Sequence, residues 1–359
     1  MKLITISYIN SAIIHIIWNY YYDDNMKKHS NIPIFIPELA CPHQCVFCDQ
    51  EKISGARSIL QPEDVKDIVE RYLATIPESR IINIAFFGGS FTGLPIDLQE
   101  KYLKEAFQFV KNGRISGVRL STRPDYINKE ILKLLNKYGV TTIELGAQST
   151  NWEVLIRSGR GHTSKDIRDA SELITEYGFE LGLQMMIGLP RDNYERSIQT
   201  ANDIVSLGAA NTRIYPAVVV KGTALGKLYQ EGKYTPLTIE QAVEWTKDIV
   251  HIFEKNNVSI IRIGLHPSDE LVIGKSLIDG PFHASFKEMV MTQIWKEIIN
   301  TELNDITSNK IKITVSNRQL QYAIGYRQAN KERLKSRGYH VRFERNPSFS
   351  HYQIDVCDN

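Results

Sequence analysis

Short apolar stretches alternate with longer amphipathic stretches along the chain from Ile32 onward. Seven of the short stretches are apolar and often β-branched, as expected for strands that are covered on both faces. The seven predicted strands are Pro33–Pro37, Ile82–Phe87, Val118–Thr122, Thr142–Ala147, Glu180–Ile187, Thr212–Val219 and Ser259–Ile263.

The stretches between these strands carry apolar residues at helical spacing and end in recognisable caps. The expected helix starts are Asn128, Thr163 with Asp166, and Thr238, and the expected ends are Gly139, Gly178 and Gly208. Repeated strand–helix units predict an α/β fold with a parallel sheet, either doubly wound or a barrel. In both architectures ligands bind at the carboxyl ends of the strands.

The two ends of the chain depart from this pattern. Leu3–Tyr22 is apolar and aromatic but interrupted by polar residues, and Met26 followed by two lysines resembles a second start. We therefore expect residues 1–25 to be an appendage outside the fold, with a short amphipathic anchor as the alternative. The core is expected over 26–300, with a C-terminal extension beginning near 258.

A small basic module is expected over residues 301–359. Ten Lys or Arg residues and two acidic residues lie between Lys310 and Arg345. Ile311–Val315 and Val341–Phe343 are predicted strands, so the module is expected to be α+β. The whole chain is nearly neutral, with 43 Lys and Arg against 41 Asp and Glu, so overall charge alone predicts no polyanionic partner.

Cysteine usage changes the picture. The chain has four cysteines, of which Cys41, Cys45 and Cys48 share one segment directly after the first predicted strand. This clustering excludes a disulfide framework and indicates a metal site in a reducing compartment, for which we expect the cytoplasm. Three thiolates can ligate three irons of a 4Fe–4S cluster and leave the fourth iron open, whereas clusters that only carry electrons usually have four cysteines.

An open iron suits S-adenosylmethionine (SAM), which can chelate it through its amino and carboxylate groups. Phe47, just before the third cysteine, is then a candidate to pack against adenine. The alternative is a structural zinc site completed by His43, His29 or Cys357, although zinc ligands normally come as two separated pairs.

Further motifs follow at successive strand ends. They are Phe86-Phe87-Gly88-Gly89-Ser90-Phe91-Thr92-Gly93, Ser121-Thr122-Arg123-Pro124-Asp125-Tyr126, Glu144-Leu145-Gly146-Ala147-Gln148-Ser149, Arg160-Gly161-His162-Thr163, Gln184-Met185-Met186-Ile187-Gly188-Leu189-Pro190 and Ile214-Tyr215-Pro216. With the cysteine motif, this succession resembles the radical SAM domain of the Elongator catalytic subunit and its bacterial relatives. The resemblance runs from about residue 31 to 290.

The resemblance implies a partial, roughly six-stranded (β/α) barrel of TIM type, with a 4Fe–4S cluster and SAM at its top. It implies that a flavodoxin or ferredoxin reduces the cluster. SAM is then cleaved to a 5′-deoxyadenosyl radical that abstracts hydrogen from the substrate. No protein acid, base or nucleophile is expected to act in that first step, because the cofactors supply the chemistry.

The resemblance also implies roles for individual residues. Gly88, Gly89 and Ser90 correspond to the segment near the SAM amino group, although the glycines alone would fit a tight turn. Glu144 and Gln148, expected on one face of a strand, are candidates for the SAM ribose. Arg160 is a candidate for the SAM carboxylate, with a surface ion pair as the alternative. Met186, Gly188 and Tyr215 are candidates for the adenine side, with a place in the core as the alternative. Arg123 and Asp125 are candidates for contact with the substrate, with a mutual salt bridge as the alternative.

Some features depart from the family pattern. The cysteine loop is shorter than in Elongator subunits, and we expect no acetyltransferase domain, which makes carboxymethylation of wobble uridine doubtful. Oxygen-independent coproporphyrinogen oxidases have a further cysteine where this chain has Gln50. In the basic module, Gly325–Gln328 before a basic helix is weakly similar to the Gly-x-x-Gly loop of a KH module, with Gln328 in place of the second glycine.

Three interpretations follow. The first is a radical SAM enzyme that acts on tRNA or another RNA, which the basic module would bind. The second is a radical SAM enzyme that acts on a small molecule of coproporphyrinogen type. The third is a non-catalytic, zinc-binding nucleic-acid adaptor. No stable membrane insertion is expected under any of them.

Overall fold

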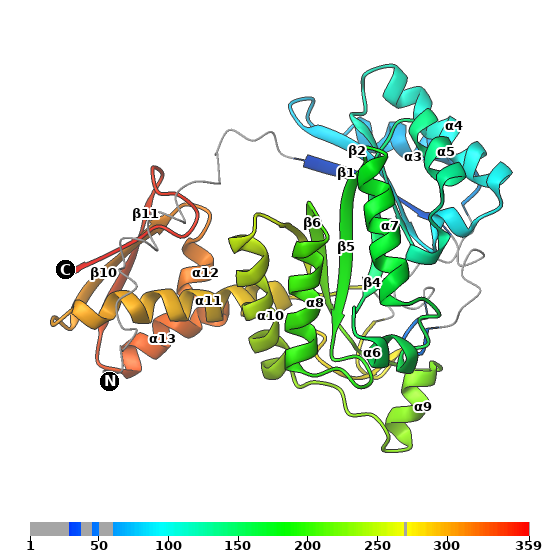
Figure 1. Ribbon diagram of the computed structural model, residues 1–359. Helices are drawn as coiled ribbons and strands as arrows, with labels where there is room; N and C mark the ends of the chain where they lie inside the picture. The colour runs from blue at the N-terminus through cyan, green and yellow to red at the C-terminus, as the bar shows by residue number, and fades with distance from the viewer. Residues whose placement is uncertain (1–28, 37–44, 50–59, 269–270, 359) are drawn as a thin grey trace, which may run out of the picture. The chain divides into compact units, whose positions relative to one another are not determined.

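The computed structural model describes residues 29–36, 45–49, 60–268 and 271–358 (Figure 1). These residues form two compact units, one ending at Ala284 and one beginning at Ser285. The segment 1–25, predicted to be an appendage, lies outside the described residues, as does Cys41. Within the described part of the chain, no helix is long and apolar enough to cross a membrane.

The first unit is built on a seven-stranded sheet in which all neighbouring strands are parallel. Its order is β1 (His29–Ile36), β2 (Ile81–Gly88), β3 (Gly117–Thr122), β4 (Val140–Gln148), β5 (Glu180–Ile187), β6 (Asn211–Pro216) and β8 (Ser259–Ile263). The prediction of an α/β partial barrel is confirmed, and the sheet has seven strands rather than about six. Because all strands run in the same direction, their carboxyl ends share one edge.

Helices connect the strands and pack against the sheet (Figure 1). The main ones are α3 (Asp64–Leu73), α4 (Ile96–Lys111), α5 (Lys129–Lys137), α7 (Ser164–Glu176), α8 (Tyr194–Ser206) and α10 (Ile239–Lys255). The predicted caps are confirmed: Asn128 Oδ1 accepts from Ile131 N at 2.9 Å, and Thr163 and Asp166 form a capping box.

Alternation along the strands divides the sheet into two faces. In β4, Ile143, Leu145 and Ala147 are fully buried, whereas Glu144 between them contacts arginines of β3 and β6. One face is therefore an apolar layer and the other carries polar groups. Two short helices, α6 (Trp152–Arg157) and α9 (Ala224–Gln230), and the two-stranded sheet of β7 (Val219–Val220) and β9 (Leu277–Asp279), complete the unit.

The second unit contains a three-stranded sheet in the order β11–β10–β12. Its elements are α11 (Phe286–Glu302), β10 (Lys310–Ser316), α12 (Leu320–Ile324), α13 (Ala329–Ser336), β11 (His340–Asn346) and β12 (Ile354–Asp358). Both predicted strands are present, and β12 was not predicted. The helix α11 packs with the elements of this unit, which begins at Ser285, and the predicted module boundary near residue 301 stays a prediction.

Candidate functional site

The cysteine loop lies between two helix ends at the carboxyl edge of the sheet. Val46 N donates to Ser158 O, directly after α6, at 3.0 Å, and Val46 O accepts from Leu225 N of α9 at 2.7 Å. A turn closed by Cys48 N and Cys45 O, 3.0 Å apart, brings two of the predicted ligands together. Neither cysteine forms a disulfide.

An apolar cluster surrounds this loop. Phe47 and Cys45 are buried in it together with Met186 of β5, and Tyr215 of β6 packs against them. The structure therefore brings together three residues that were predicted separately to line the adenine side. Their role in binding adenine stays a prediction.

Arg160 lies directly against the cysteine loop. Its Nη1 donates to Cys45 Sγ at 3.1 Å, and its Nη2 donates to Gly146 O. The residue is 6% exposed, so it does not form the surface ion pair that was considered for it. Arg160 is therefore a fixed, buried positive charge beside one of the predicted cluster ligands.

Arg123 and Asp125 lie beside Arg160. They form a bidentate salt bridge with both N–O distances at 2.9 Å, and Arg123 Nη2 donates to Arg160 O. The mutual salt bridge is thus present, and a contact of either residue with substrate stays a prediction. Arg123 also holds the backbone of Arg160 in place.

His162 is a buried neighbour that the sequence did not single out. It is 4% exposed, and burial together with the positive charges of Arg160 and Arg123 lowers the pKa of its imidazole to about 3. His162 is therefore neutral at physiological pH. The sequence feature that could have pointed to His162 is its position in the Arg160–Thr163 motif.

The carboxyl end of β4 is irregular. The pairing of β4 with β5 shifts between Leu145 and Gln148, and Gln148 has a φ of 64°. A Cβ on Gly146 would lie 3.1 Å from Gln148 Nε2 and 3.4 Å from Arg160 Nη2. Gln148 and Arg160 therefore lie side by side in a space that exists because residue 146 has no side chain.

Glu144, predicted with Gln148 for the ribose, is already bound by protein groups. Its carboxylate accepts from Arg119 Nε at 2.9 Å, from Arg213 Nε at 2.6 Å and from Gln184 Nε2 at 3.2 Å. Burial alone would raise the pKa of Glu144, but the bonds and charges of Arg213 and Arg119 lower it below its usual value. Its role toward the ribose stays a prediction.

Arg119 and Arg213 were missed by the sequence reasoning. They were visible as charged residues inside otherwise apolar strands, which is unusual unless the charge is paired. Arg213 also lies over the ring of Phe87, 4.9 Å from its centroid.

The glycine segment after β2 packs tightly against β1. Gly88 has a φ of +101°, and a Cβ there would lie 2.6 Å from Ile36 O. Gly89 N donates to the same oxygen at 3.0 Å, and the buried Ser90 follows. Glycine at 88 is thus required for the close approach of β2 to β1, the strand that leads into the cysteine loop.

Gly188, at the end of β5, is held by two polar contacts. Its N–H donates to Asp192 Oδ2 at 2.8 Å, and its carbonyl accepts from Tyr234 Oη at 2.6 Å. Burial raises the pKa of Asp192 to about 6. These bonds fix the turn after β5. The sequence predicted Gly188 only as a residue that lines the adenine side.

The residues present fit a metal cluster and a polar cofactor. Two cysteines that form no disulfide lie on one turn, and two buried polar atoms of the site, Gln148 Oε1 and Arg160 Nε, have no hydrogen-bond partner in the described part of the chain. Buried polar atoms without partners are rare unless a ligand or water satisfies them. Among the described residues, no three His, Cys, Asp or Glu side chains lie so that they could hold a metal ion, and the third predicted ligand, Cys41, lies outside those residues.

Comparison with known families identifies the fold of this site. Residues 36–204 match the radical SAM superfamily, and residues 210–296 match the Radical_SAM C-terminal domain. The chain belongs to the radical SAM superfamily. Members of this superfamily bind a 4Fe–4S cluster and SAM, which are therefore the cofactors of this chain.

Within the superfamily, the chain is similar to two differently named groups. It is 25% identical over 250 residues to a tRNA uridine(34) acetyltransferase of Methanocaldococcus jannaschii, covering 57% of this chain and 45% of that protein. It is 27% identical over 234 residues to the heme chaperone HemW of Bacillus subtilis, covering 61% of this chain and 59% of HemW. The chain thus spans about half the length of these relatives.

A solved structure supports the fold. The archaeal Elp3 of Methanocaldococcus infernus, with an N-terminal deletion, matches with a TM-score of 0.60 and 21% sequence identity. The match covers 76% of this chain and 63% of the Elp3 chain. At this identity the likeness shows a shared radical SAM fold.

Proposed function

We propose that this chain is a radical SAM enzyme that acts on RNA, with tRNA as the first candidate. The observation that carries the proposal is the similarity of the radical SAM region to tRNA uridine(34) acetyltransferase. The basic C-terminal unit adds independent support, because RNA phosphates attract clustered Lys and Arg. A flavodoxin or ferredoxin as electron donor and a cytoplasmic location belong to the same proposal.

In this proposal Cys41, Cys45 and Cys48 hold the cluster. When bound, the cluster and SAM supply a 5′-deoxyadenosyl radical that abstracts hydrogen from the substrate. The apolar residues Phe47 and Met186 exclude water from the cofactor site.

Polar groups of the site orient SAM. The buried Arg160 Nε and Gln148 Oε1 have no partner among the described residues, which supports contacts to the SAM carboxylate and ribose. Gly88, with no room for a Cβ, keeps β2 close to β1 at the entry to the cysteine loop.

The C-terminal unit offers a rigid loop next to basic side chains. The loop Gly325–Gln328 joins α12 to α13, and Tyr326 N donates to Thr292 Oγ1 of α11 at 2.7 Å. The buried amide of Asn330 donates to Thr292 O at 3.0 Å and to Ala323 O at 3.2 Å. These bonds fix the loop on α11.

Basic side chains flank that loop. Arg327 and Arg337 are exposed and Lys331 is half-buried, so all three can reach solvent around α13. Phosphates of an RNA backbone are the anions that such a basic surface would bind, and each neutralised phosphate adds to the salt dependence of binding.

RNA binding is tested by its salt dependence. We expect the chain to bind tRNA with an affinity that falls steeply with salt. Replacing Arg327, Lys331 and Arg337 by Gln should weaken binding and reduce the slope of log K against log salt by roughly 2–3. A matched triple replacement by Gln on α5, of Lys129, Lys133 and Lys137, should leave the slope unchanged. Equal slopes for the two variants would contradict the role of the basic unit.

Activity is tested by hydrogen transfer. Reduced enzyme is incubated without oxygen with SAM and deuterated cellular RNA, and deuterium is sought in 5′-deoxyadenosine. The proposal expects label from RNA and none when Cys45 is replaced by Ala. Label that arises only from small-molecule extracts would contradict an RNA substrate.

A second candidate is a function on a tetrapyrrole, favoured by the similarity to the heme chaperone HemW. It predicts that heme or a coproporphyrinogen-like compound binds the chain with higher affinity than RNA does. Label transfer from small-molecule extracts would support a reaction on a coproporphyrinogen-like compound, and tighter binding of heme than of tRNA would support heme binding.

A further inference from the structure

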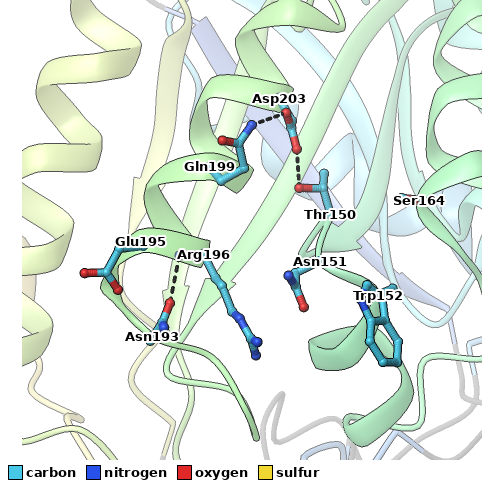
Figure 2. Close-up of a pocket in the computed structure, with 9 residues that line it drawn as sticks. All are labelled: Thr150, Asn151, Trp152, Ser164, Asn193, Glu195, Arg196, Gln199 and Asp203. Atoms are coloured by element: carbon cyan, nitrogen blue, oxygen red, sulfur yellow. Dashed lines mark hydrogen bonds between the residues drawn. The ribbon is translucent and has the colours of Figure 1, made fainter.

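A pocket opens between the turn after β4 and the start of α8 (Figure 2). Its volume is about 650 Å³. The side chains that matter are those of Asn151, Trp152, Asn193, Arg196, Gln199 and Asp203, all of which line it. None of them belongs to the predicted cluster or SAM site.

Trp152 is the most unusual of these residues. The residue is 68% exposed at the pocket, and Ile156, one helical turn later, is 67% exposed. Large apolar side chains are normally buried, as Trp295 of the second unit is. An exposed indole offers a flat apolar face to which a planar ring can stack.

The polar groups of the pocket are largely neutral donors and acceptors. Asn151 Oδ1 caps α6 and Asn193 Oδ1 caps α8, so their amide N–H groups remain as donors. Gln199 Nε2 donates to Asp203 Oδ1 at 2.7 Å, which leaves Gln199 Oε1 as an acceptor. Side-chain amides in this arrangement match the hydrogen-bonding edge of a nucleobase.

The charges of the pocket disfavour a phosphate. The guanidinium of Arg196 is bonded to Glu153 Oε2 at 2.7 Å, so its charge is compensated within the protein. Asp203 and Glu195 add carboxylates to the lining. A neutral aromatic ring therefore suits the pocket better than an anion does.

The helix that begins with Trp152 is followed directly by a contact with the cysteine loop. Trp152 is the first residue of α6 and Ser158 directly follows the helix. The carbonyl of Ser158 accepts a hydrogen bond from Val46 N of the cysteine loop. The rise of a helix places Trp152 and Ser158 about 9 Å apart along its axis. Trp152 and the residue that bonds the cysteine loop thus lie at opposite ends of the same short helix.

We propose that this α6–α8 pocket binds an unpaired nucleobase of the substrate RNA, stacked on Trp152 and held at its edge by Asn151, Asn193 and Gln199. This inference rests on the proposed function, which supplies RNA as the substrate. It adds the place where one base of that RNA binds and requires that the bound segment be single-stranded. Single-stranded RNA is recognised in this way because its bases are free to stack on aromatic side chains.

The test uses a short single-stranded oligoribonucleotide that contains 2-aminopurine, whose fluorescence changes on stacking, titrated into the full chain. Trp152→Ala should weaken binding about tenfold or more, whereas Trp152→Phe, which keeps a ring, should stay within a few-fold of the parent chain. Ile156→Ala is the matched control, because it removes an exposed apolar side chain from the same helix.

The salt dependence separates this inference from the proposed function. Trp152→Ala should leave the salt slope of binding unchanged, since no phosphate contact is lost. If RNA binds with a steep salt slope but Trp152→Ala binds like the parent or like Ile156→Ala, the pocket proposal is wrong and the RNA function stands. If no RNA binds the parent chain, both are wrong. A change in self-association with unchanged RNA binding would show that the pocket serves a protein contact.

Discussion

Arg160 sets the local electrostatics at the cysteine loop. Its Nη1 lies 3.1 Å from Cys45 Sγ, at a position buried from solvent. Hydrogen bonds and positive charge at a ligating sulfur stabilise the more negative, reduced state of an iron–sulfur cluster. Arg123, which is paired with Asp125, holds the backbone of this arginine by donating a hydrogen bond to the carbonyl of Arg160.

Replacing this arginine should change the reduction potential of the cluster. We expect Arg160→Gln to shift the midpoint potential of the reconstituted cluster to more negative values, because one N–H···S bond and one positive charge are lost. A redox titration followed by electron paramagnetic resonance measures this. Arg157→Gln, an exposed arginine of α6, is the control and should leave the potential unchanged. An unchanged potential in Arg160→Gln would contradict the contact.

His162 should make the protein sensitive to acid. Its pKa is about 3 in the folded chain against an ordinary value of 6.5, so the unfolded chain binds more protons between these values. The stabilisation is fully present above about pH 6.5 and is lost as the pH falls toward 3, by at most about 1.4 kcal/mol per pH unit. Urea unfolding at pH 7 and pH 5 should show a smaller loss in His162→Asn than in the parent. His29→Asn, at an exposed position, should behave like the parent.

At the scale of elements, the close contact between the ends of β1 and β2 fixes the position from which the chain enters the cysteine loop. Ile36 O bonds Gly89 N and leaves no room for a side chain at Gly88. The pairing of β1 with β2 can therefore extend to Ile36 only because residue 88 is a glycine. Helix ends are determined more locally, as at Gly178 after α7, where a Cβ would meet nothing within 4 Å.

These two glycines form a matched pair for mutation. Gly178→Ala should destabilise the chain by about 1–2 kcal/mol, because a left-handed residue with a side chain is strained. Gly88→Ala should destabilise it more and lower the iron bound per protein, because the new Cβ would also overlap Ile36 O. Urea unfolding and iron analysis measure the two effects. Equal losses in both variants, with normal iron content, would show that the close approach is unimportant.

At the scale of the whole molecule, cluster binding and folding of the first unit should be linked. A ligand that binds only the folded state stabilises that state by mass action. Anaerobic reconstitution with iron and sulfide should therefore raise the unfolding temperature of the parent chain. Cys48→Ala should abolish the increase.

Cys357→Ala is the control for that experiment. Cys357 lies in β12 of the second unit and pairs in register with Lys312 of β10. Its replacement should leave both the iron content and the increase in unfolding temperature intact. A chain that loses its cluster with Cys357→Ala would support the alternative in which this cysteine completes the metal site.

The sequence by itself determined the features that depend on local spacing. The cysteine motif together with the motifs at successive strand ends predicted the cofactors, the apolar stretches predicted the seven strands of the main sheet, and side chains such as Asn128 predicted the helix caps. These features could be predicted because strand burial and capping involve neighbours within a few residues.

Only the tertiary structure decided which distant groups meet. Arg160 contacts Cys45 across 115 residues of sequence, and Arg213 pairs with Glu144 across 69. The irregular end of β4 and the pocket beside Trp152 likewise arise where separate strand–helix units pack together. Such contacts depend on the order and curvature of the strands, and residue spacing alone does not specify either of them.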